Sequence, residues 1–119
     1  EEILQAQALV RQVNISEDMI KYVSTLIRAT RPDTTNIGYI KEWVRWGAGP
    51  RAGQALILTA KARALLKGRY SVIAEDLHAM AAPVLRHRIL LNFKAEAENI
   101  TTDMVTAELI KVIERPNPL

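Results

Sequence analysis

Residues 46–66 read WGAGPRAGQALILTAKARALL and contain the most apolar helical stretch of the chain. Pro50 suits the first position of a helix, where its missing N–H is no loss, and Gly49 can take the capping position before it. Gly68 follows Lys67 as a suitable C-terminal glycine. Because apolar residues cover nearly the whole circumference, the stretch predicts a buried helix over about residues 50–67. We expect this alanine- and leucine-rich helix to be the centre of a small bundle.

The segments on either side have the same helical period. Apolar residues spaced by three and four predict a first helix to about Arg11. Ser16 predicts the cap of a second helix, which ends at Arg31-Pro32 because proline disfavours helical geometry in the residue before it. Further helical segments are expected through Tyr39, Ile40, Trp43 and Val44, from about Ala74 to Ala82, and after a cap at Thr101. The sequence therefore predicts an all-α domain of about five helices.

Several finer predictions concern the ends and faces of these helices. Pro83 is expected to interrupt the helix that begins at Ala74. The acids Glu75 and Asp76 lie in the first turn of that helix, where the macrodipole explains them. Short extended pieces are expected near residues 13–15, 70–72 and 89–92. The inward face of the last helix is predicted to consist of Val105, Leu109, Val112 and Ile113.

The composition excludes several classes of protein. The 119 residues are enough for one compact domain, and no cysteine is present to form a disulfide or a thiolate metal site. His78 and His87 lie on different segments without a second ligand at helical spacing, so we expect surface histidines and no metal. No apolar run approaches the roughly 20 residues that span a bilayer, so no membrane partner is expected and an intracellular location is the default. The net charge of +3 is small.

No catalytic constellation is found in the sequence. The glycines around Arg51 lack the lysine and hydroxyl of a phosphate-binding P-loop. The acids at 75–76 are better explained as helix-start residues than as a magnesium site. No serine lies in a nucleophile elbow. The chain by itself is therefore predicted to have no catalytic residues and not to be an enzyme.

Arg51 is the residue that could bind a phosphate. In the first turn of a helix it lies beside unpaired backbone N–H groups and the positive end of the dipole, and its planar fork of donors matches phosphate oxygens. Gly49 would let a ligand come close, and Trp46 with residues 32–49 is expected to fix the helix start. A solvated arginine explains the same pattern, so the residues alone leave both interpretations open.

Four segments together resemble a known family. The segments WGAGPRA from Trp46, AKARALLKGRY from Ala60, EDL from Glu75 and APVLRHRI from Ala82 are similar to the C-terminal lid subdomain of MoxR-type AAA+ ATPases and, more distantly, to magnesium-chelatase ATPase subunits. The match runs from about Leu4 to Leu109. Gly49 replaces the family's usual serine, and Ile73-Ala74 replaces a Thr/Ser-Pro pair.

The resemblance implies a specific role for the chain. Arg51 matches the second sensor arginine, which reaches the γ-phosphate of ATP, with Gly49 and Pro50 shaping the helix start. Residues 1–119 would be a single helical lid, a fragment of a larger cytoplasmic ATPase whose P-loop core precedes Glu1. The parent would use ATP and Mg, whereas no cofactor is expected on the fragment.

The resemblance also implies partners for the lid. They are its own AAA+ core, the neighbouring subunits of a ring and, for the parent, proteins with von Willebrand factor A domains whose assembly or activation it assists. In the wider clade, an insertion before the lid places the arginine against a neighbouring subunit's nucleotide, which favours action in trans.

Two alternatives come from other classes of protein. A basic stripe would suit a small helical nucleic-acid-binding module, and it would consist of Arg45, Arg51, Arg63, Lys67, Arg69, Arg86 and Arg88. Against it, no predicted helix has a dense basic face. A purely structural adaptor would leave Arg51 without a ligand. The turn of Arg86, His87 and Arg88 is assigned no chemical role.

Overall fold

The structure is a computed structural model that describes residues 2–33, 35 and 37–113. Within these residues the chain forms seven helices and one two-stranded sheet, so the predicted all-α class is confirmed. The elements are α1 (Glu2–Gln12), α2 (Glu17–Ala29), α3 (Gly38–Trp43), β1 (Val44–Trp46), α4 (Pro50–Leu66), α5 (Ala74–Leu85), β2 (Leu90–Leu91), α6 (Phe93–Ala97) and α7 (Thr102–Val112).

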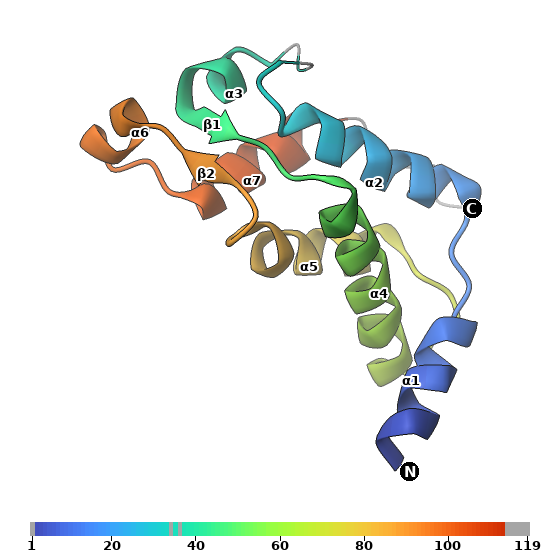
Figure 1. The fold of residues 1–119 in the computed structure, drawn as a ribbon. Helices are drawn as coiled ribbons and strands as arrows, with labels where there is room; N and C mark the ends of the chain where they lie inside the picture. The colour runs from blue at the N-terminus through green and yellow to red at the C-terminus, as the bar shows by residue number, and fades with distance from the viewer. Residues whose placement is uncertain (1, 34, 36, 114–119) are drawn as a thin grey trace.

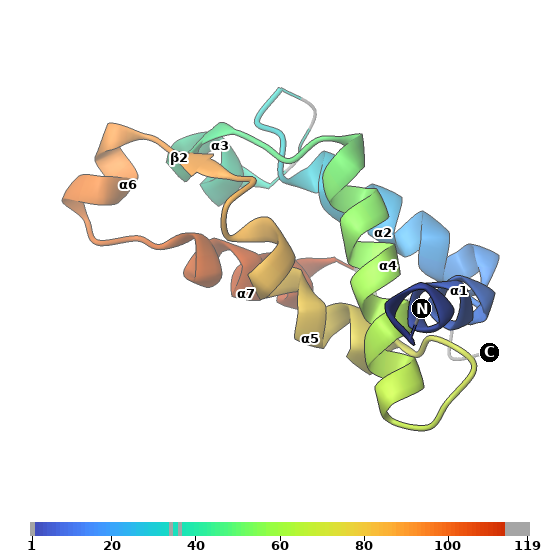
Figure 2. The same cartoon turned by 60° about the horizontal axis from the view of Figure 1, so that its bottom comes forward.

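The predicted central helix is α4, which packs against α1, α2 and α5 (Figure 1). Helix α1 lies beside the C-terminal half of α4 at one end of the domain. The sheet, α3 and α6 lie at the other end, and α7 packs along α5 (Figure 2).

Helix α4 buries one stripe and not its whole circumference. The stripe has a spacing of four residues and consists of Ala52, Leu56, Ala60 and Ala64. Leu58 and Leu66 are 49% and 88% exposed, so the prediction of burial on all sides is wrong. Three helices can cover only part of a helix surface, and a periodicity argument cannot show which part stays open.

The helix caps follow the sequence closely. The Ser16 hydroxyl accepts a hydrogen bond from the Met19 N–H, and the Thr101 hydroxyl accepts one from the Met104 N–H, as predicted. Gly68, which follows the C-cap residue Lys67 of α4, adopts a φ of +78°, a conformation that favours glycine. Asn92 caps the short helix α6, which was not predicted because the run before it indicates an extended segment.

Two predictions about helices fail. Pro83 lies inside α5, which continues to Leu85. A proline at this position removes a hydrogen bond to the Ala79 carbonyl; Ala79 is exposed, so that carbonyl can face water instead. In α7, Val112 is 56% exposed, and Thr106 is buried beside Val105 and Leu109.

The β structure is short. Strands β1 and β2 pair antiparallel with Val44 opposite Leu91 and Trp46 opposite Leu90, with an irregularity between them. A parallel bridge joins Asn14 to Ser71, which ties the α1–α2 linker to the segment after α4. The extended pieces expected near residues 13–15, 70–72 and 89–92 are thus present, whereas β1 was not predicted.

Candidate functional site

The start of α4 is open to solvent. Arg51 is exposed, lies in the first turn of the helix and forms no ion pair with a described carboxylate. Gly49 occupies the capping position in an extended conformation, so no side chain caps the helix. A Cβ atom at Gly49 would meet nothing within 4 Å. Pro50 has no N–H and the Ala52 N–H donates to the Gly49 carbonyl at 3.0 Å, so the Arg51 N–H is the one left at the very start of the helix. The positive end of the α4 dipole and the exposed Arg51 side chain lie beside this N–H.

A buried contact fixes this helix start against the end of α2. Thr30 is fully buried, and its hydroxyl donates to the Ile27 carbonyl at 2.6 Å and accepts from the Ala48 N–H at 2.9 Å. A Cβ atom at Gly47 would lie 2.5 Å from the Thr30 carbonyl oxygen and 2.6 Å from the Arg31 Cα. We call Thr30, Arg31, Gly47 and Ala48 the α2–α4 junction.

The prediction that Trp46 and residues 32–49 fix the helix start is confirmed for the segment, through Gly47 and Ala48, but not for the Trp46 side chain. The Trp46 side chain is 64% exposed and contributes through the β1 backbone, while the close packing is made by Gly47 and Ala48. Thr30 and Gly47 are visible in the sequence, but nothing in their spacing predicts that they come into contact.

We expect Gly47→Ala to destabilise the domain by about 1–3 kcal/mol, because the added methyl would overlap backbone atoms and something must move. Gly49→Ala is the matched control, since the same atom added two residues later meets open space in an extended backbone. Thermal unfolding of both variants measures the difference. Equal melting temperatures would contradict the close approach at Gly47.

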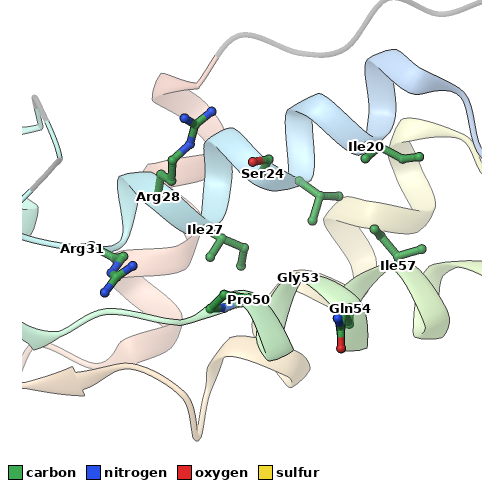
Figure 3. Close-up of a pocket in the computed structure, with 10 residues that line it drawn as sticks. Ile20, Ser24, Ile27, Arg28, Arg31, Pro50, Gly53, Gln54 and Ile57 are labelled. Carbon is green, nitrogen blue, oxygen red and sulfur yellow. The ribbon is translucent and has the colours of Figure 1, made fainter.

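A groove runs between α2 and α4 next to the junction (Figure 3). Its volume is about 290 Å³, and its floor lies over Val23, Ile27 and Gly53. Arg31 and Pro50 border the groove at the end nearest the start of α4, and Arg51 is not among its lining residues. The groove and the exposed arginine are therefore neighbours but separate features.

An ionic cluster that the sequence did not reveal lies at the other end of α4. Asp76 is fully buried, and its carboxylate accepts from Arg63 Nη1 at 2.6 Å and from Arg69 at 2.7 and 2.8 Å. The Ile73 N–H donates to the same carboxylate at 2.9 Å, so Asp76 also caps α5. Burial raises the pKa of Asp76, but hydrogen bonds from Arg69, the Ile73 N–H and Arg63 outweigh burial and lower the pKa to about 2.

Much of the proposed basic stripe is thus engaged in intramolecular contacts. Arg63 and Arg69 hold Asp76, and Arg86 forms two hydrogen bonds with Asp103 at 2.9 and 3.1 Å. Arg88 donates to the Val84 carbonyl at 2.8 Å. Arg86 and Arg88 therefore have structural contacts of their own, and His87 is exposed as expected.

His78 differs from the predicted surface histidine. His78 is part-buried, and its Nε2 lies 2.9 Å from the Tyr22 hydroxyl, so the prediction of a surface histidine is wrong there. Across residues 2–33, 35 and 37–113, no group of three His, Cys, Asp or Glu side chains could hold a metal ion. In the same part of the chain, no helix combines the length and apolar character that crossing a membrane requires.

Comparison with known proteins assigns the fold. The model of the AAA lid domain family matches residues 39–109, more than half of the chain. The chain belongs to this family. The lid is 31% identical over 116 residues to Chaperone MoxR1 of Mycobacterium tuberculosis, a match that spans 97% of the lid and 31% of the relative. Over 49 residues it is 45% identical to Protein MoxR of Paracoccus denitrificans.

A solved structure agrees with these relatives. A predicted ATPase from Cytophaga hutchinsonii matches 92% of the lid and 34% of its own chain, with a TM-score of 0.86 and 33% identity. The resemblance to MoxR-type lids is confirmed. The chain spans about a third of the length of MoxR1 and of this ATPase.

Proposed function

We propose that the lid closes over ATP held by the core of a MoxR-type ATPase and that Arg51 contacts the γ-phosphate. The observation that carries the proposal is an exposed arginine, without a described carboxylate partner, in the first turn of a helix whose preceding segment is bonded to the buried Thr30 hydroxyl. An arginine that awaits phosphate cannot already be neutralised inside the bundle without the cost of breaking that pair.

The chemistry of the helix start supports an anionic ligand. The positive end of α4 and the Arg51 N–H favour negative charge, and the guanidinium adds donors in a fork that matches phosphate oxygens. Gly49 has no side chain to cap the helix start, and the space that a Cβ there would fill is open to a ligand. The α2–α4 junction supplies the rigidity that a contact to one phosphate oxygen needs.

The rest of the proposal concerns the parent protein. Its core would bind ATP and Mg, and the lid would contact that core and the neighbouring subunits of a ring, with Arg51 acting in trans. The parent would be a cytoplasmic, chaperone-like ATPase that assists the assembly or activation of protein complexes, including proteins with von Willebrand factor A domains. The name of MoxR1 as a chaperone supports this class of activity.

A nucleic-acid-binding module or an adaptor is the weaker candidate. Arg63, Arg69 and Arg86 are engaged with carboxylates of the same chain. A phosphate backbone would have to compete with these internal ion pairs, and the remaining exposed cations form no dense face on one helix.

The isolated chain is expected to bind ATP only at millimolar concentrations and not to hydrolyse it. A few charge-assisted hydrogen bonds of about 1.5–3 kcal/mol each must offset the cost of association, and millimolar affinity already needs about 4 kcal/mol. Titration of the ¹⁵N-labelled chain with MgATP should shift amide signals near residues 49–53, and Arg51→Ala should abolish the shifts. Micromolar binding by calorimetry would contradict a lid, and shifts centred on residues 86–88 would favour a different anion site.

A further inference from the structure

We propose that Arg31 is a second phosphate-contacting arginine of the site formed by Arg51, an inference that rests on the proposed function. Arg31 follows the C-cap residue of α2, is exposed and forms no ion pair with a described carboxylate. Asp33 is the nearest acid along the chain, and it does not pair with Arg31. In the sequence, Arg31 before Pro32 indicates only the end of a helix.

The junction places Arg31 next to the start of α4. The position of a Cβ on Gly47 would be 2.6 Å from the Arg31 Cα and 2.7 Å from its backbone nitrogen, so the two chain segments are in direct contact. Gly47 precedes Arg51 by four residues, a path of at most about 14 Å even when extended. With the step of about 4 Å from Gly47 to Arg31 added, the Cα atoms of Arg31 and Arg51 are at most about 18 Å apart. Two arginine side chains that start within this distance can reach oxygens at the two ends of one polyphosphate.

The direction of the side chain agrees with this position. Figure 3 shows Arg31 directed toward the segment that leads into Pro50, whereas Arg28, one turn earlier on α2, points away from α4. An arginine that served only the C-terminal carbonyls of α2 would turn back toward its own helix. Arg31 instead adds its charge to the positive end of another helix.

This arrangement collects positive charge at one place. Arg31, Arg51 and the N-terminus of α4 all carry positive charge, and no described carboxylate pairs with either arginine. A multiply charged anion would neutralise both guanidinium groups and satisfy their donors. Two arginines from two helices fit oxygens on different phosphates better than one orthophosphate, so the site should prefer a nucleoside triphosphate or another polyphosphate to a single phosphate.

The titration uses the ¹⁵N-labelled chain with tripolyphosphate and with orthophosphate at equal ionic strength. The wild-type chain should bind tripolyphosphate more tightly than orthophosphate. Arg31→Ala should weaken tripolyphosphate binding about tenfold, as expected for the loss of one charge-assisted contact, and reduce the preference. Arg31→Lys should restore part of the affinity but not the preference, because a point charge replaces a fork. Arg28→Ala removes the same charge from the last turn of α2, where the side chain points away from α4, and this control should leave both affinities unchanged.

The outcomes separate this inference from the proposed function. If Arg51→Ala loses tripolyphosphate binding while Arg31→Ala behaves like Arg28→Ala, the role of Arg31 is refuted and that of Arg51 stands. If neither Arg31→Ala nor Arg51→Ala changes binding, the proposed function itself fails. A loss in Arg31→Ala that follows a lowered melting temperature would assign Arg31 a structural role and overturn the inference. In the full-length ATPase, Arg31→Ala should raise KM for ATP more than it lowers kcat.

Discussion

Asp76→Ala is expected to lower the free energy of unfolding of the lid by about 3 kcal/mol. Removing one partner of a buried ion pair costs about 3–5 kcal/mol, because a charge is left without compensation. Asp76 is fully buried, but the side chains of Arg63 and Arg69 are 20% and 32% exposed. Because water can reach both arginines, we expect a loss at the lower end of this range. The change also removes the acceptor for the Ile73 N–H at the start of α5. A domain with a total stability of about 5–15 kcal/mol would lose a large share of it.

Glu75→Ala is the matched control for this experiment. Glu75 is adjacent in sequence and reaches the same arginine, Arg63, at 3.4 Å, but its side chain is 71% exposed. An exposed pair contributes about 0–1 kcal/mol, so chemical denaturation of the control should differ little from that of the parent chain. Similar losses of unfolding free energy in the two variants would show that the buried cluster stabilises the lid no more than an exposed ion pair does.

The same cluster predicts how stability depends on pH. Because the folded pKa of Asp76 is lowered to about 2 from an ordinary value of about 3.9, its contribution is present above about pH 4 and is lost as the pH falls toward 2. Asp76→Asn should lack this part of the acid dependence. Asp103, whose pKa is lowered by its hydrogen bonds with Arg86, is present in both proteins, so the difference between the two curves isolates Asp76. Parallel curves would contradict the assigned pKa.

The sequence predicts most of the fold because local chemistry decides most helix ends. Ser16, Thr101 and Gly68 act where the sequence places them. Pro83 misleads because a proline in a helix is tolerated when the carbonyl it leaves unpaired is on an exposed residue. The Asp76 cluster could not be predicted, since dipole effects already explain an acid in a first turn.

The candidate site was partly predictable, because one of its parts depends on a helix end. The place of Arg51 in the first turn of α4 is predictable because Gly49 and Pro50 indicate where the helix begins. Arg31, Thr30 and Gly47 are brought together by tertiary packing between α2 and the segment before α4, for which the sequence has no periodic signal. A glycine between Trp46 and Ala48 predicts some close approach, but not the segment that approaches.

Arg51→Ala in the full-length ATPase is expected to lower ATP turnover by about 10²–10³-fold while the lid stays folded. The loss of one preorganised donor to charge that develops in a transition state has an effect of this size. The exposed side chain makes no ion pair with a described carboxylate, so its removal should shift the melting temperature of the isolated chain very little.

Two further variants test whether the effect of Arg51→Ala comes from a phosphate contact. Arg51→Lys should recover only part of the turnover, because a single ammonium replaces a planar fork that can contact two oxygens. Arg45→Ala is the control, since Arg45 is an exposed arginine on β1, six residues earlier, with the same charge and no assigned ligand. If Arg51→Ala and Arg45→Ala lower turnover equally, the effect is general electrostatics and not a phosphate contact. If Arg51→Ala unfolds the lid, the arginine holds the fold and the γ-phosphate assignment is wrong.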